Sequence, residues 1–319
     1  MKEPWFWRDR SIAAKTVGAI MTPLAMLYDA GQRLRRALTR ARPADAPVIC
    51  VGGTSIGGAG KTPFAIMLCR KLQQRGVVAH FATRGFGGAL AGPVRVNAAH
   101  EAKDVGDEAL LLAAAAPTFV AKNRLDGVRA AASGADFVIM DDGFQNPTVK
   151  KDFSILLINQ SDMEDGARVF PAGRLREPLA RAVARADAVI ISGDGAVEAG
   201  GKPVFHASVR IIDPPAPRRA LAFCGVANPA RFFSSLEKAG MTLVDRLAFA
   251  DHHPYSPADI AMLKKRAATE NAALITTEKD FVRLPREARE DVLTLKIETA
   301  LDNADDLVGV IMKQFGKAA

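Results

Sequence analysis

Cysteine and aromatic residues are scarce in this sequence of 319 residues. The three cysteines, Cys50, Cys69 and Cys224, are scattered and show no CxxC spacing. An odd number of isolated cysteines argues against a disulfide framework or a zinc site and favours a reducing, cytoplasmic compartment. Aromatic residues make up only 6% of the chain, and alanine-rich stretches dominate. An all-β sandwich is therefore disfavoured, and alternating helices and short apolar strands are expected.

The sequence also lacks an apolar run that is long enough to cross a bilayer. The strongest candidate, residues 16–28, follows Lys15, contains Pro23 and is shorter than the ~20 residues that a spanning helix needs. No A-x-A-type cleavage site follows it, which disfavours a signal peptide. We therefore expect residues 1–42 to form an amphipathic segment on a membrane surface. The alternative is an N-terminal helix that docks on the body of the protein.

Positive charge is concentrated in the same segment. The chain has 43 Lys and Arg against 35 Asp and Glu, a net charge of +8. Residues 1–42 carry nine basic and three acidic residues, and so hold six of the eight net charges. The rest of the chain is nearly neutral, which disfavours a groove for nucleic acid. The cluster Arg33, Arg35, Arg36 and Arg40 suits anionic lipid, because each basic group near such a surface contributes about 1 kcal/mol.

A phosphate-binding loop is the most specific motif. Residues 48–51 read as a buried strand, residues 52–62 have the sequence GGTSIGGAGKT, and residues 63–74 read as a helix. Strand, glycine-rich loop and helix form the context in which backbone N–H groups cradle the phosphates of ATP. The expected binding residues are Ser55, Gly57, Gly58, Ala59, Gly60, Lys61 and Thr62, with Lys61 on the β and γ phosphates and Thr62 on Mg²⁺. Ser55 stands where the general motif has its first glycine.

Acidic residues follow a second buried strand. The apolar run at 137–140 ends at Asp141 and Asp142. A carboxylate at this position can hold Mg²⁺ opposite Thr62, and we take Asp141 as the first candidate. The alternative is that both carboxylates are ordinary strand-end caps.

Further candidates lie between these two motifs. Asp107 and Glu108 open an alanine- and leucine-rich helix, where they either complement the helix dipole or face a ligand. Asn123 and Arg124 follow a strand-like segment at 117–121 and are either solvated or in contact with substrate.

Taken together, the motifs resemble those of the tetraacyldisaccharide 4'-kinase family, and the resemblance runs nearly end to end. It rests on the phosphate loop, DDGFQ at 141–145, FPAGRLREP at 170–178, GDE at 106–108, ADHH at 250–253 and TTEKD at 276–280. The resemblance implies transfer of the γ-phosphate of ATP, with Mg²⁺, to the 4'-hydroxyl of a tetraacylated glucosamine disaccharide 1-phosphate. It also implies a catalytic Asp107–His252 dyad, with Arg176 and Glu177 near the reaction centre. The sequence alone gives no role to Thr277, Glu278 or Lys279.

Strand and helix patterns alternate along the chain, which predicts an α/β fold with a mostly parallel sheet and helices on both faces. A proline-rich break near residue 213 predicts three parts: the amphipathic segment 1–42, a phosphate-loop core at 43–212 and a smaller α/β domain at 213–319. The active site is then expected in the cleft between the two domains. We expect a monomer bound peripherally to the cytoplasmic face of the inner membrane. The alternative function is a nucleotide-switched membrane-binding ATPase of the partitioning type, although Ile56 replaces the second lysine of that class.

Overall fold

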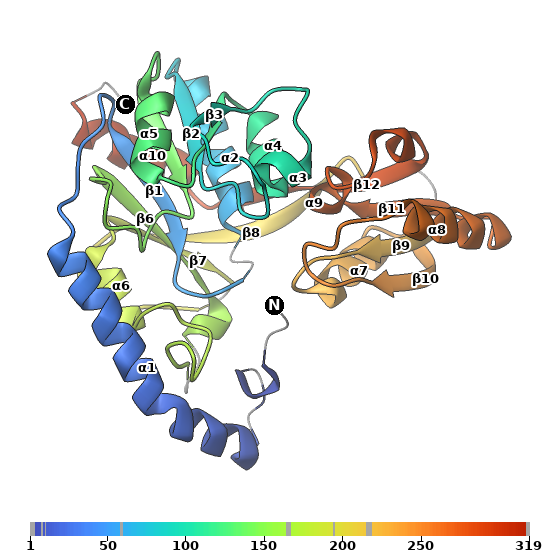
Figure 1. Ribbon diagram of the computed structural model, residues 1–319, viewed down its shortest axis with the longest axis horizontal. Coiled ribbons are helices and arrows are strands. Elements are labelled where there is room, and N and C mark those ends of the chain that lie inside the picture. The colour runs from blue at the N-terminus through green and yellow to red at the C-terminus, as the bar shows by residue number, and fades with distance from the viewer. Residues whose placement is uncertain are drawn as a thin grey trace.

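The computed structural model describes residues 4–7, 9, 11–57, 60–163, 167–193, 195–214 and 219–316. It contains a 12-stranded sheet in the order β10-β9-β11-β12-β8-β7-β6-β1-β5-β2-β4-β3, with helices on both faces, as expected (Figure 1). Only the β3–β4 and β8–β12 pairs are antiparallel among the described strands. The strands are β1 Val48–Gly53, β2 Ala79–Thr83, β3 Val94–Arg95, β4 Thr118–Val120, β5 Phe137–Asp141, β6 Phe153–Asn159, β7 Ala188–Ser192, β8 Val204–Ile212, β9 Arg219–Cys224, β10 Thr242–Ala248, β11 Ala273–Thr277 and β12 Val292–Leu301.

The helices occupy most of the segments between these strands. They are α1 Ile12–Leu38, α2 Lys61–Gln74, α3 Ala102–Val105, α4 Asp107–Ala113, α5 Arg124–Ala132, α6 Leu179–Arg185, α7 Pro229–Lys238, α8 Pro257–Thr269, α9 Glu278–Phe281 and α10 Ala304–Gln314, with short 3-10 turns η1 Trp5–Trp7, η2 Gln160–Asp162 and η3 Arg286–Asp291.

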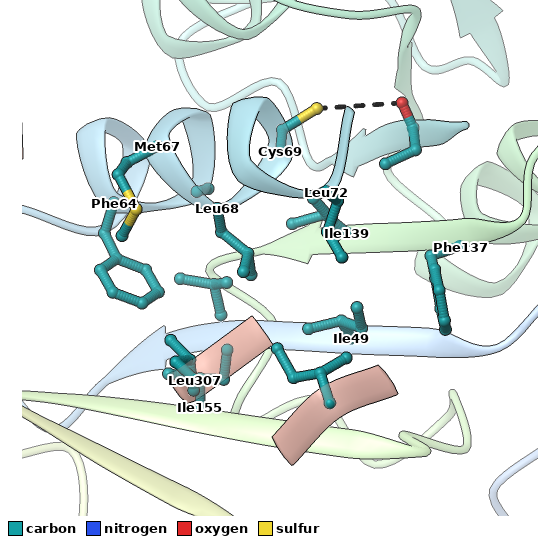
Figure 2. Close-up of a cluster of buried hydrophobic side chains, with 14 of the residues drawn as sticks. Ile49, Phe64, Met67, Leu68, Cys69, Leu72, Phe137, Ile139, Ile155 and Leu307 are labelled. Carbon is teal, nitrogen blue, oxygen red and sulfur yellow. Dashed lines mark hydrogen bonds between the residues drawn. The ribbon is translucent and has the colours of Figure 1, made fainter. Parts of the chain in front are cut away.

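Alternating side chains of the central strands build two hydrophobic cores. Ile49 of β1 and Ile139 of β5 pack on one face, together with Phe64 and Leu68 of α2 (Figure 2). Their neighbours in sequence point to the other face, toward α5 and α6, because successive side chains of a strand alternate. The packing of α2 fixes its N-terminus, which begins at Lys61, at the carboxyl end of β1.

Strands β8 and β12 join two lobes. We call residues 46–203 with 304–316 the first lobe, and residues 219–295 the second lobe. β8 lies beside β7 only as far as Ala207, and then continues past the end of β7 at Ser192. β12 pairs with β11 as far as Leu295 and then runs antiparallel to β8. The second lobe therefore lies beyond the carboxyl edge of the first, with its strands reversed, so that the carboxyl ends of both sets of strands face each other.

The position of the last helix, α10, differs from the domain division that the sequence predicts. The sequence groups residues 213–319 as one C-terminal domain, whereas Leu307 and Ile311 of α10 pack in the core of the first lobe. The chain therefore crosses to the second lobe along β8 and returns along β12. A proline-rich break marks the first crossing but carries no signal for the return.

The N-terminal helix α1 extends along one side of the first lobe, opposite the second lobe (Figure 1). Ser11 caps it by accepting a hydrogen bond from the N–H of Ala14. It runs to Leu38, ten residues beyond the apolar part that the sequence indicates. Within the described ranges, no helix combines the length and the apolar character that a bilayer crossing needs.

Candidate active site

The phosphate loop connects β1 to α2 at the carboxyl edge of the first lobe. Gly52 allows β1 to pass close to the loop after β5, because a Cβ atom there would lie 2.4 Å from the Cβ of Phe144. Gly60 has a φ of 70° and ends the loop in a left-handed conformation that favours glycine. Ser55 is buried and forms a β-bridge with Leu175, so the entry to the loop is held by the FPAGRLREP stretch. Gly57 precedes Gly58 and Ala59, which lie outside the described residues.

Thr62 and Asp141 meet where the sequence predicts a magnesium site. The Oγ1 of Thr62 donates a hydrogen bond of 2.9 Å to the Oδ2 of Asp141. The Oδ1 of Asp141 is buried without a hydrogen-bond partner among the described residues. Burial, together with the negative charges of Glu108 and Asp142, raises the pKa of Asp141. The Oδ1 of Asp141 is therefore available as an oxygen ligand beside Thr62. Such a site fits Mg²⁺, because Mg²⁺ binds few protein ligands and takes oxygens of phosphates and water as well.

No group of three or more His, Cys, Asp or Glu side chains in the described part of the chain is arranged to hold a metal ion by itself.

Asp142 holds two cations beside this site. Its backbone has a φ of 48°, and its carboxylate faces Lys61 at the end of the phosphate loop. The Nζ of Lys61 lies 3.3 Å from its Oδ1, and Arg176 donates two hydrogen bonds to the carboxylate, at 2.8 and 3.1 Å. Burial acts to raise the pKa of Asp142, but the charges of Lys61 and Arg176 outweigh it and hold that pKa well below its usual range. Asp142 is therefore an ionised group that orients Lys61 and Arg176.

Asn123 and Arg124 support this arrangement from behind. Arg124 is buried, and its Nη2 donates to the backbone carbonyls of Asp141 and Asp142. Asn123 caps α5 by accepting a hydrogen bond from the N–H of Leu125. In this structure the contacts of both residues are made within the protein, and contact with a substrate stays a prediction.

Glu177 is buried and engaged inside the protein. Its two oxygens accept hydrogen bonds of 2.6 and 2.7 Å from Arg185. The side chain of Gln145 bridges Glu177 and Arg176, since its Nε2 donates to Glu177 and its Oε1 accepts from Arg176. Glu177 therefore positions Arg176 through Gln145. Because Glu177 is buried and hydrogen-bonded within the protein, its role in this structure is to support Arg176.

The same stretch contacts the N-terminal helix. The Nη2 of Arg36 in α1 lies 3.6 Å from the Oε2 of Glu177. Asp29 of α1 is buried and accepts from Arg181 at 2.5 Å, and the indole N–H of Trp7 donates to the carbonyl of Pro171. The amphipathic segment is thus attached directly to the loop that carries Arg176.

Asp107 and His252, which are 145 residues apart, are in contact between the two lobes. The Nδ1 of His252 lies 2.9 Å from the Oδ2 of Asp107. Gly106 places Asp107 at the start of α4, because its φ is 87° and a Cβ atom there would lie 2.3 Å from the carbonyl oxygen of Phe86. His252 has a φ of 59°, and its N–H donates to the carbonyl of Gly225. The facing carboxyl ends of the two lobes therefore assemble the dyad that the resemblance implies.

The carboxylate of Asp107 is kept ionised by its neighbours. It is only 3% exposed, and the Nε of Arg283 lies 3.4 Å from its Oδ2. Burial acts to raise the pKa of Asp107, but the hydrogen bond with His252 and the charges of Lys279 and Arg283 outweigh it and lower that pKa. Its Oδ1 accepts a hydrogen bond from the N–H of Glu108. A negative acceptor is therefore fixed between the two lobes.

Two further charged residues of this cluster are not identified by the sequence. Arg283 is 5% exposed and also pairs with Asp280 at 2.7 Å. The Nζ of Lys279 lies 3.3 Å from the Nε2 of His252 and 3.5 Å from the Oε1 of Glu108. Lys279 belongs to the TTEKD motif at a predicted strand end, which was the available signal, whereas Arg283 lies beyond the motif.

The site therefore consists of two groups of side chains. Lys61, Thr62, Asp141, Asp142 and Arg176 form one group beside the phosphate loop, which we call the metal group after the Mg²⁺ that the sequence predicts there. Asp107, His252 and Glu108 form a second group between the lobes. Glu108 links them, since it pairs with Lys279 on one side and contributes to the raised pKa of Asp141 on the other. Phosphoryl transfer to a hydroxyl requires cationic side chains that hold the phosphates and, beside them, an ionised group that accepts the hydroxyl proton.

Known proteins resemble this chain over nearly all of its length. The family model of Tetraacyldisaccharide-1-P 4'-kinase matches residues 17–315. The tetraacyldisaccharide 4'-kinase of Rhodospirillum centenum is 44% identical over 320 residues, covering 96% of this chain and 95% of the relative. That of Hyphomonas neptunium is 40% identical and covers 99% of this chain and 100% of the relative. A crystal structure of LpxK from Aquifex aeolicus in complex with ATP has a TM-score of 0.78 and 25% identity, covering 94% of this chain and 99% of that one. These findings confirm the resemblance indicated by the motifs: the chain belongs to the tetraacyldisaccharide 4'-kinase family.

Proposed function

We propose that this enzyme transfers the γ-phosphate of ATP to the 4'-hydroxyl of a tetraacylated glucosamine disaccharide 1-phosphate, a step of lipid A biosynthesis. The family and the names of its members support this activity, and the ATP complex of the Aquifex aeolicus protein supports ATP as the donor. The observation that carries the proposal is the 2.9 Å contact between Asp107 and His252 in the cleft beside the phosphate loop.

In this proposal the phosphate loop binds the triphosphate of ATP. Its backbone N–H groups and the N-terminus of α2 favour anionic oxygens, and Lys61 is oriented toward them by Asp142. Thr62 and Asp141 would hold Mg²⁺, which when bound neutralises negative charge on the phosphates. Arg176 adds a planar guanidinium that can hold phosphate oxygens in two parallel hydrogen bonds.

In this proposal the dyad of Asp107 and His252 activates the sugar hydroxyl. Asp107 is ionised and aligned by His252, so it can accept the hydroxyl proton as the new P–O bond forms. The second lobe supplies His252 and thereby covers the cleft, which limits attack by water on ATP.

We further propose that the enzyme acts at the cytoplasmic face of the inner membrane, as a peripheral monomer that does not bind nucleic acid. The outer face of α1 supports this location, because Ile12, Ile20, Leu24, Leu27 and Leu38 are 50 to 84% exposed. Apolar side chains on one face of a helix with basic neighbours suit the headgroup region of an anionic bilayer. Since α1 contacts the stretch that holds Arg176, an acylated substrate at the surface would lie close to the site.

The proposal is tested by transfer from labelled ATP to a detergent-dispersed tetraacylated disaccharide 1-phosphate, with the unacylated disaccharide as control. Label is expected in the acylated product and not, or far more slowly, in the control. Equal labelling of both sugars would remove the lipid part of the proposal, and absence of label in either would remove the kinase assignment.

A further inference from the structure

Lys279 is the residue of the TTEKD motif that points into the cleft. It lies in α9, directly after β11, and its side chain is 24% exposed. Its Nζ lies 3.3 Å from the Nε2 of His252 and 3.5 Å from the Oε1 of Glu108. It is therefore placed between a member of the dyad and the carboxylate that faces the metal group.

The direction of the contact with His252 follows from the chemistry of the two groups. A lysine ammonium has three donors and no acceptor. It can therefore only donate to the Nε2 of His252, which must then carry a lone pair. In the neutral imidazole the proton is then on Nδ1, where it is donated to Asp107 at 2.9 Å.

We infer that Lys279 is a positioning residue of the dyad, which holds His252 in the neutral Nδ1–H form and leaves the carboxylate of Asp107 as the proton acceptor. This inference rests on the proposed function for its catalytic meaning. It assigns His252 the part of an aligning donor, because its second nitrogen is already occupied by Lys279.

Charges of both signs surround the imidazole of His252. The imidazole is faced by Asp107 from α4, by Lys279 from α9 and, more distantly, by Asp251 of its own loop, whose Oδ2 lies 3.9 Å from Nε2. Arg283 stands behind Asp107 at 3.4 Å. Two cations oppose a third positive charge on the ring, whereas the two carboxylates would favour it.

The test combines ¹⁵N NMR of the histidine rings with kinetics. The variant Lys279→Met removes the charge at similar length, Lys279→Arg keeps it, and Lys264→Met is the control, since Lys264 pairs with Asp291 on the surface. The signals of His252 are assigned by comparison with His252→Gln. The wild type, Lys279→Arg and Lys264→Met are expected to show the Nδ1–H tautomer, and Lys279→Met to show loss of that single form.

In the kinetic arm, Lys279→Met is expected to lower kcat by about tenfold or more with an unchanged KM for ATP. Lys279→Arg should restore kcat. An Nε2–H tautomer in the wild type, or an unchanged tautomer and an unchanged kcat in Lys279→Met, would overturn the inference. If Lys279→Met does not fold by circular dichroism, Lys279→Gln replaces it. The NMR arm needs no substrate, so it decides on Lys279 even if the wild type fails to phosphorylate the acylated disaccharide.

Discussion

Replacing Asp107 by asparagine removes the negative charge of the dyad while keeping its size. The asparagine side chain can still accept a hydrogen bond from the Nδ1–H of His252. Arg283 retains its 2.7 Å partner Asp280, so it is not left as an unpaired buried charge. The loss of charge-assisted hydrogen bonds should lower the free energy of unfolding by about 1.5–3 kcal/mol, which leaves the protein folded.

The effect on catalysis should be far larger. Loss of a general base costs roughly 10²–10⁴ in rate, equivalent to about 2.7–5.4 kcal/mol at the transition state. ATP binding should change by less than about twofold, because Asp107 has no hydrogen bond or ion pair with the described part of the phosphate loop. The fall should therefore appear in kcat for lipid phosphorylation, with the Kd for ATP preserved in calorimetry.

The chain offers a matched control in a second Asp–His pair. Asp259 contacts His253 at 3.1 Å on the adjoining surface, so Asp259→Asn should leave kcat unchanged. His252→Gln and the double variant with Asp107→Asn complete a cycle, in which residues that act as one unit give a double loss no larger than the greater single loss. If the double variant lost kcat by the product of the two single losses, Asp107 and His252 would not act as one unit. An equal loss of ATP affinity and kcat in Asp107→Asn would show that Asp107 is not a proton acceptor acting only in the transfer step.

The remaining predictions concern the metal group, the phosphate loop and α1. The pKa of Asp141 is raised in the folded protein, so its ionisation lowers the free energy of unfolding above the folded pKa and has no such cost below the unfolded pKa. Without Mg²⁺ and nucleotide, Asp141→Asn should therefore raise Tm at pH 8 by about 1.5 °C for each kcal/mol regained. An equal rise in Tm at pH 3 would contradict this. Lys61→Ala should lower kcat by about 10²–10³-fold, measured by label transfer, and near-normal transfer would exclude Lys61 from the phosphates. Changing Ile20, Leu24 and Leu27 to serine should weaken binding to anionic vesicles by more than about tenfold in co-sedimentation, whereas unchanged binding would reject α1 as the membrane contact.

The sequence predicts the parallel strands of the first lobe closely, because they are largely buried and read as short continuous apolar runs, whereas the two-residue antiparallel β3 is not predicted. The buried strand expected at 48–51 is observed as β1 Val48–Gly53, and the apolar run at 137–140 lies in β5 Phe137–Asp141. The sequence does not predict β8 or β12. These strands are half exposed, so that buried Phe205 lies next to exposed His206 and no apolar run stands out. Period-two alternation was the signal that could have identified them.

The candidate site likewise contains residues that the sequence predicts and contacts that it does not predict. Lys61, Thr62 and Asp141 follow from local patterns, since each lies at the end of a buried strand or the start of the next helix. The contact of Asp107 with His252 does not follow from spacing, because it depends on the antiparallel β8–β12 pair that reverses the second lobe. Only the family resemblance paired these two residues. The same reversal brings Lys279 into the cleft, so sequence reasoning left it without a role.

The phosphate loop and the dyad are proposed to phosphorylate together one sugar hydroxyl of a lipid. This is measured by ³¹P NMR and mass spectrometry of the lipid recovered after turnover with ATP and Mg²⁺. We expect a gain of one phosphate per disaccharide, on the 4'-hydroxyl, in step with the ADP formed. Release of inorganic phosphate with the lipid unchanged, or phosphate at another hydroxyl, would contradict it.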